Sequence, residues 1–196
     1  MDFREFYEYV NRLEKPPVGF DFLRGLIAAH HREIGRVDLF AVTHPTPTRD
    51  AYYRLGDTDR TSPYEEEFAV GEIVYCESLD LDERELRFAL TKELMHVFDA
   101  VEARTDTREK FEKLLREIQN RPLPADQSLM FKTELDTRWM ASIVLCPKRF
   151  RDELIDKYRN GEIADFDVAE EFNIPEWVAP FIMDDYYDAA FRSLLR

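Results

Sequence analysis

Strand character in this chain is confined to the stretch between residues 37 and 77, and this uneven distribution limits the possible folds most strongly. The run VDLFAVTH, residues 37–44, has the β-branched and aromatic content of a short strand. The run GEIVYCE, residues 71–77, is apolar and of strand length, and the polar stretch 46–67 predicts a hairpin or a long loop. We therefore expect an α+β fold with a small sheet packed on a helical core.

The rest of the chain has the apolar periodicity of helices. One helix is predicted over residues 3–13, and a second runs from Asp21, its cap, to Ile34, with Gly35 as its stop. The predicted helices that follow are one from Asp80 through Asp106, one over 107–119, one over 128–145 stopped at Pro147, one over 149–159 stopped at Asn160-Gly161, and one with Pro175 at its first position.

Composition and charge exclude several classes of protein. The 196 residues include 27 Lys and Arg against 41 Asp and Glu, a formal charge of −14. This balance argues against nucleic-acid binding through bulk charge, which needs a basic surface. A hydrophobic share of 44% is enough for a core and excludes intrinsic disorder. Because the chain has no apolar run of about 18 residues, no signal-peptide pattern and few cysteines, we expect a cytoplasmic protein without a membrane partner.

One segment, RFALTKELMHVFD at residues 87–99, stands apart from the other helical patterns. On a helical wheel Lys92, His96 and Asp99 cluster on the side opposite to its apolar stripe. The segment resembles the RFTLAHELGHLLL-type helix of the ImmA/IrrE family of zinc metallo-endopeptidases, in which H-E-x-x-H carries two zinc ligands and the general base. The resemblance implies that His96 stands at a ligand position and Glu93 at the position of the general base.

Two further segments extend this resemblance. TELDTRWMASIVLCP, residues 133–147, is similar to the family's E-x-x-A-N-x-F-A-x-x-L-L-M-P segment, and alignment on its final proline puts the acidic third ligand at Glu134. DVAEEFNIPEWV, residues 167–178, is similar to the helix-turn-helix-like unit that follows the family's peptidase core. The resemblance implies a zincin-like, metallopeptidase-like domain over residues 1–147 and a helical C-terminal extension over residues 148–196.

The motif departs from the family pattern at its first ligand, because the chain reads Lys92-Glu93-Leu94-Met95-His96. Two histidines one helical turn apart can share a metal, and the glutamate beside the first takes a proton from the metal-bound water. A protonated lysine has no lone pair to offer a metal. His96 and Glu134 alone leave the site one ligand short. Asp99 is the best local substitute, and His44 cannot be placed from the sequence.

Lys92 can instead replace the metal electrostatically. Its ammonium group, on the same helix face, would pair with Glu134 or Glu93 and hold the two helices without metal, at a net stabilisation often near zero. The simpler interpretations are a solvated lysine on an exposed face and a helix histidine bonded to a neighbour. Met95 replaces a glycine of the family and indicates that the packing over this turn has changed.

Two functions follow from these interpretations. The first is a degenerate, non-hydrolytic member of the family, without cofactor, that binds a protein partner; the resemblance implies a regulatory setting, prokaryotic or phage-related, with a transcriptional regulator as partner. The alternative is an active zinc endopeptidase with a variant site that cleaves such a regulator. A purely structural subunit is a third possibility. The 167–178 unit has no Lys or Arg, so we expect no DNA contact there.

Overall fold

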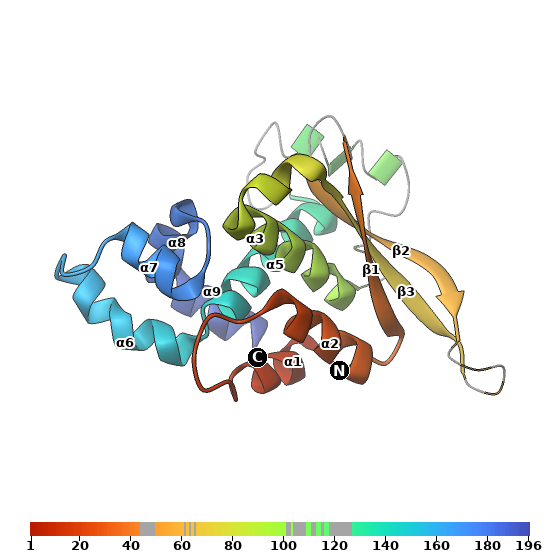
Figure 1. The fold of residues 1–196 in the computed structure, drawn as a ribbon, viewed down its shortest axis with the longest axis horizontal. Coiled ribbons are helices and arrows are strands. Elements are labelled where there is room, and N and C mark those ends of the chain that lie inside the picture. Colours follow the sequence, from red (N-terminus) through yellow and green to blue (C-terminus); the bar gives the residue numbers. More distant parts are fainter. Residues whose placement is uncertain are drawn as a thin grey trace.

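The computed structural model describes residues 1–43, 50–60, 62, 64, 66–100, 103, 109–110, 113–114, 116–117 and 127–196. The described part has an α+β fold, as the sequence predicts, with a three-stranded sheet at one end and helices elsewhere (Figure 1). The elements are α1 Phe3–Val10, α2 Phe20–His30, β1 Ile34–Val42, β2 Ala51–Asp59, β3 Phe68–Cys76, η1 Glu77–Leu81, α3 Glu83–Leu94, η2 Met95–Phe98, α5 Leu129–Leu145, α6 Lys148–Arg159, α7 Asp165–Phe172, η5 Glu176–Val178, α8 Ala179–Met183 and α9 Tyr186–Leu194. Among the described helices, none combines the length and the apolar character that crossing a membrane requires.

The central strand of the sheet is β3. It pairs in parallel with β1 and antiparallel with β2, which gives the order β1-β3-β2. Both strands predicted from apolar runs are present, and each begins before its predicted first residue. The stretch predicted as a hairpin or loop contains β2, and its antiparallel pairing with β3 makes the two strands a hairpin. The strand pattern of residues 37–77 is therefore confirmed.

The predicted end of the second helix at Gly35 was wrong. Helix α2 ends at His30, and Gly35 belongs to β1. The His31 ring explains the earlier exit, because its Nδ1 accepts hydrogen bonds from the backbone N–H groups of Glu33 and Ile34. A Cβ atom at Gly35 would lie 2.4 Å from the ring of Phe68, so the glycine permits close packing against that ring rather than a helix C-cap. Asp21 lies in the first turn of α2, whose N-cap is Gly19.

The long helix predicted from Asp80 is shorter than expected. Asp82 caps α3 by accepting hydrogen bonds from the backbone N–H groups of Arg84 and Glu85. The α-helix ends at Leu94, the 3-10 turn η2 follows, and the backbone at Asp99 is extended. The prediction of an uninterrupted helix through Asp99 was wrong because its carboxylate bonds to the side chain three residues earlier and so competes with helix continuation.

Helix α5 matches its prediction. Ser128 accepts a hydrogen bond from the backbone N–H of Phe131 at the N-terminus, and the helix ends before Pro147. The helix predicted over residues 107–119 lies largely outside the described residues. Helix α6 ends at Asn160 and Gly161 as expected, with the glycine at φ 72°. Pro175 is the residue before η5 rather than the first residue of a helix, a small correction to the prediction.

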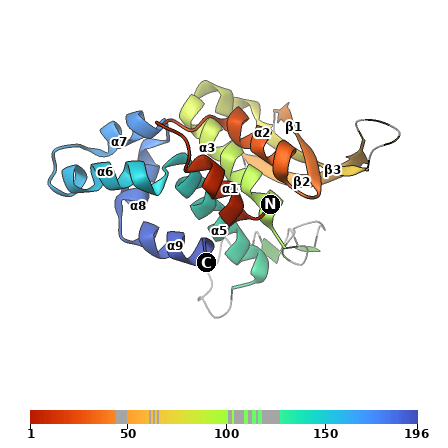
Figure 2. The ribbon, with the colours of Figure 1, turned by 90° about the horizontal axis from the view of Figure 1, so that it is seen from below.

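The C-terminal helices pack on the same core as the rest of the chain. The Tyr187 hydroxyl donates to the carbonyl of Cys146 over 2.7 Å, and the backbone N–H of Lys148 donates to the Tyr7 hydroxyl over 3.0 Å. Figure 2 shows α1 and α2 beside α3 and α5, with the sheet at one end of the molecule and α6, α7 and α8 at the other. One buried apolar cluster includes residues of α1, α2, α3, α5 and the C-terminal helices.

Candidate functional site

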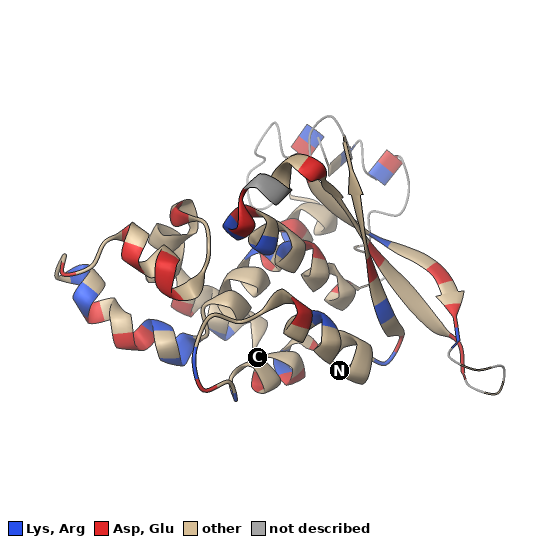
Figure 3. Ribbon diagram, viewed as in Figure 1, with Lys and Arg blue, Asp and Glu red and all other residues tan. Residues whose placement is uncertain are grey.

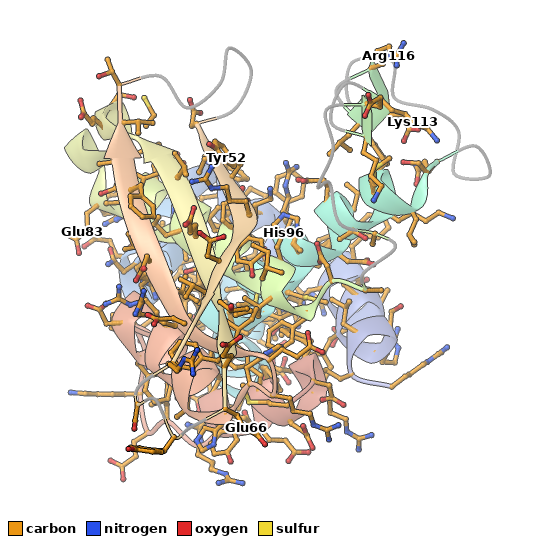
Figure 4. All side chains as sticks on the ribbon, turned by 90° about the vertical axis from the view of Figure 1, so that its right-hand side faces the viewer. Tyr52, Glu66, Glu83, His96, Lys113 and Arg116 are labelled. Atoms are coloured by element: carbon orange, nitrogen blue, oxygen red, sulfur yellow. The ribbon has the colours of Figure 1, made fainter. Side chains whose placement is uncertain are left out.

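The predicted site residues converge where α3 and η2 face β2 and α5. Lys92 and Glu93 belong to the last turn of α3, His96 to η2, and Glu134 to α5. In Figure 4 the labelled His96 lies between the strands of the sheet and α5. Two of the three sequence segments on which the resemblance rests, residues 87–99 and 133–147, supply elements that lie against one another, since α5 contacts both α3 and η2.

The Lys92 ammonium lies between two carboxylates. Its Nζ donates to Glu93 Oε1 over 2.8 Å and to Glu134 Oε2 over 2.7 Å, and the lysine and Glu134 side chains are each 14% exposed. Burial alone would lower the pKa of Lys92, but the charges of Glu93 and Glu134 outweigh burial and raise it. The lysine is therefore charged at neutral pH. The pairing with Glu134 predicted from the sequence is present, and the interpretation of Lys92 as a solvated surface residue is wrong.

Glu93 has both oxygens engaged. Its Oε1 accepts from Lys92, and its Oε2 accepts the backbone N–H of Tyr53 over 3.0 Å. The residue is 3% exposed, so this carboxylate connects the buried end of α3 to strand β2. In the family a glutamate at this position would activate a metal-bound water. Here its contacts are those of a fixed structural bridge.

The His96 imidazole has carboxylates on both sides. Its Nδ1 lies 2.7 Å from Asp99 Oδ2, while its Nε2 lies 3.6 Å from Glu93 Oε2 and 3.6 Å from Glu134 Oε1. Burial would lower the pKa of His96, but the hydrogen bond to Asp99 and nearby carboxylates raise it. The ring of Tyr53 stacks on the imidazole with centroids 6.2 Å apart. The histidine is thus held in one orientation from three directions.

Asp99, predicted as a substitute ligand, contacts the ring nitrogen that faces away from Glu93 and Glu134. A carboxylate in this place orients the imidazole and favours one tautomer, the arrangement that commonly supports a metal-binding histidine. The Asp99 carboxylate does not point to the space that the Lys92 side chain fills. His44, the other candidate, lies outside the described residues.

The donor set does not fit a zinc ion as long as Lys92 is charged. A catalytic zinc site needs three protein donors around an open position. The two carboxylates that would serve here already accept hydrogen bonds from an ammonium group, which offers no lone pair. Within the described ranges, no three His, Cys, Asp or Glu side chains converge in an arrangement that could hold a metal.

The contribution of β2 was not predicted from the sequence. Tyr53 supplies both a backbone donor to Glu93 and a ring that covers His96. Gly71 on the neighbouring β3 leaves space for that ring, because a Cβ there would lie 2.9 Å from it. Met95 is fully buried.

Comparison with family models, with curated proteins and with solved structures finds no match to this chain. The membership in the ImmA/IrrE family that its motifs imply therefore stays a prediction.

Proposed function

We propose that this chain is a non-hydrolytic, degenerate relative of the ImmA/IrrE metallopeptidases and acts by binding a regulatory protein. In this proposal residues 1–147 form a zincin-like core and residues 148–196 a helical extension. The observation that carries it is the position of the Lys92 ammonium, 2.8 Å from Glu93 Oε1 and 2.7 Å from Glu134 Oε2. A fixed cation between these carboxylates supports a site that needs no metal ion.

The loss of hydrolysis follows from the charge balance. Peptide hydrolysis by this class of site needs a metal-bound water and a free carboxylate to take its proton. With Lys92 in place, the ammonium offsets part of the negative charge of the two carboxylates, but it binds no activated water. Glu93 is engaged by Lys92 and by Tyr53, which removes its freedom to act as a base.

The partner in this proposal is a protein, and a transcriptional regulator is the kind that the family resemblance implies. The net charge of −14 favours encounter with basic surfaces and disfavours nucleic acid. The apolar frame that surrounds the altered positions supports a fold retained for recognition. Leu90, Leu94 and Leu145 are all buried.

Metal analysis of protein purified without chelator tests the proposal. We expect far less than one zinc per chain in the wild-type protein and no peptidase activity. In a matched variant, Lys92→His, zinc binding would rise toward about one ion per chain if the remaining ligand geometry is kept. Lys92→Arg is the control, because it keeps the charge and adds no lone pair.

The opposite result would establish the alternative function. About one tightly held zinc per wild-type chain, lost together with peptide cleavage in His96→Ala, would mean an active endopeptidase. His96 and Glu134, helped by Asp99, would then hold the metal, and Glu93 would act as the base. A third outcome, a zinc-free chain found only as a fixed component of a larger assembly, would favour the structural-subunit interpretation and overturn the proposed regulatory role.

A further inference from the structure

The helical run formed by η5 and α8 has an unusual outer face. The backbone angles of Val178 and Ala179 are right-handed helical, so η5 continues directly into α8. Four residues of this run face the core: Val178, Ala179, Ile182 and Met183. The opposite side carries Trp177, Pro180 and Phe181, which we call the aromatic face. An outward helix side is normally polar, so an apolar one indicates a binding surface.

The aromatic face is both exposed and ordered. Phe181 is 58% exposed and Trp177 45% exposed. The indole Nε1 of Trp177 donates to Glu85 Oε1 over 2.8 Å, and its ring packs edge-on against Phe88 with centroids 5.2 Å apart. A tryptophan held in this way contributes binding surface without losing side-chain freedom on association. Rigid, partly exposed aromatic residues of this kind are frequent energetic centres of protein interfaces.

The chain segment that carries the aromatic face is acidic. Residues 160–191 contain no Lys or Arg and nine acidic residues: Glu162, Asp165, Asp167, Glu170, Glu171, Glu176, Asp184, Asp185 and Asp188. Figure 3 shows acidic and no basic colouring on α7, whereas both colours alternate along α6.

Some of these acids are neutralised by basic residues from outside the segment. Glu170 pairs with Arg84, Asp185 with Arg159, and Asp188 with Lys148. Glu171, Glu176 and Asp184 are exposed on the same helical unit. Glu176 immediately precedes Trp177, and Asp184 follows Phe181 by three residues, so carboxylates stand at both ends of the aromatic face.

We propose that the aromatic face docks a basic amphipathic helix of a partner protein. Apolar side chains of that helix would cover Trp177 and Phe181, and its flanking Lys and Arg would face the surrounding carboxylates. Charge complementarity selects this occupant, since an acidic or neutral helix would gain nothing from the rim, and nucleic acid would be repelled. The inference deepens the proposed function by giving it a surface and a partner chemistry, and it does not depend on the state of the Lys92 site.

Binding of a synthetic peptide to the full chain tests this proposal. The probe is a labelled amphipathic helix of about 18 residues, long enough to be marginally helical, built from Leu, Ala and Lys. A matched peptide has Glu in place of every Lys. We expect saturable binding of the Lys peptide that weakens with added salt, and none of the Glu peptide. Equal binding of both peptides, or of neither, would overturn the proposal.

Matched variants locate the interaction. Phe181→Ser should weaken binding about tenfold or more, the effect of removing a central interface residue, and Glu171→Lys with Glu176→Lys should do the same. The controls are Phe40→Ser, at an aromatic residue on β1 that is 43% exposed, and Glu8→Lys with Glu14→Lys near α1. Each should change the affinity less than about twofold. If the affinity depended only on total charge and Phe181→Ser bound the peptide as tightly as the wild-type chain, the aromatic face would not be the docking surface.

A fluorescence measurement gives an independent result. The chain has two tryptophans, so Trp139→Phe leaves Trp177 as the single reporter. Its emission should shift to the blue when the Lys peptide covers it. A constant emission during saturable binding would place the peptide elsewhere. Binding to vesicles of phosphatidylcholine with phosphatidylglycerol, without peptide binding, would replace the proposed partner by a membrane.

The peptide-binding test and the zinc test have independent outcomes. A zinc-free chain that does not bind the Lys peptide would support the proposed non-hydrolytic role and refute the proposed docking at the aromatic face. A zinc-loaded chain that binds the peptide through Phe181 would refute the proposed non-hydrolytic role and support the proposed docking at the aromatic face.

Discussion

Helix α3 carries two buried cations that are stabilised in different ways. Lys92 contacts two carboxylates, Glu93 and Glu134. Arg87 donates to three backbone carbonyls, those of Val18, Phe172 and Asn173, and is 8% exposed. The pKa values reflect this contrast. Burial lowers the pKa of Arg87 to about 10, whereas the carboxylates raise that of Lys92 in spite of burial.

The two cations differ in the kind of partner that compensates their burial. Arg87 joins the segment before α2 to the end of α7 through dipoles, and no charge has to balance it. The Lys92 ammonium is held by two carboxylates, so its removal would leave buried charge without compensation. The two sites therefore respond to mutation by different mechanisms.

Replacement of Lys92 should give the largest effect. Lys92→Met keeps much of the side-chain volume but leaves Glu93 and Glu134 buried without their cation, which should destabilise the fold by about 3–5 kcal/mol. Chemical denaturation at neutral pH measures the loss. It should shrink as the pH is lowered, because the excess carboxylates can then take up protons.

A double variant tests whether charge is the cause. Lys92→Met with Glu134→Gln removes one of the two carboxylates and should recover part of the lost stability. A loss below about 1 kcal/mol in the single variant would show that water screens the cluster, and it would remove the distinction between the two cations.

Replacement of Arg87 should have a smaller but still marked effect. Arg87→Met leaves the carbonyls of Val18, Phe172 and Asn173 without this donor, which should cost about 2–3 kcal/mol. Because no carboxylate pairs are broken, the loss should stay constant between about pH 5 and pH 8, unlike that at Lys92. Thermal unfolding of both variants across this range distinguishes the two. Arg84→Met, which removes an outer ion pair with Glu170 and a cation–π contact with Phe166, is the control and should cost less than about 1 kcal/mol.

The same contrast explains which parts of the molecule the sequence predicts. The pairing of Lys92 with Glu134 is predictable because Lys92 departs from an aligned motif in which Glu134 stands at an acidic position. The role of Arg87 is invisible in sequence, because its acceptors are backbone carbonyls that every residue has. The contact of Tyr53 with Glu93 depends on the pairing of β2 with β3, which residues far apart in the chain determine.

The helix ends show a similar limit to what the sequence alone predicts. Ser128 and Pro147 mark α5 correctly because capping and chain stiffness act within a few residues. Gly35 resembles a helix stop in the sequence, but it allows close contact with Phe68 from another strand. The end of α3 was missed because the hydrogen bond between Asp99 and His96 competes with a helical pattern that continues in the sequence.

Replacement of Asp188 should change the stability least, and it tests how a buried cation with both kinds of partner behaves. Asp188 contacts a third buried cation, Arg151, which also donates to the carbonyls of Ile182 and Asp184 and so combines both kinds of partner. The hydrogen bond from Lys148 holds the pKa of Asp188 below its usual value, although burial opposes this. A carboxyl group with a lowered pKa stabilises the fold above its unfolded pKa, and this stabilisation is lost as the pH falls through the folded value. Asp188→Asn should therefore cost less than about 1 kcal/mol at neutral pH and nothing in acid. If the loss instead approached that of Lys92→Met and persisted at low pH, Arg151 would depend on its carboxylate rather than on its carbonyl partners.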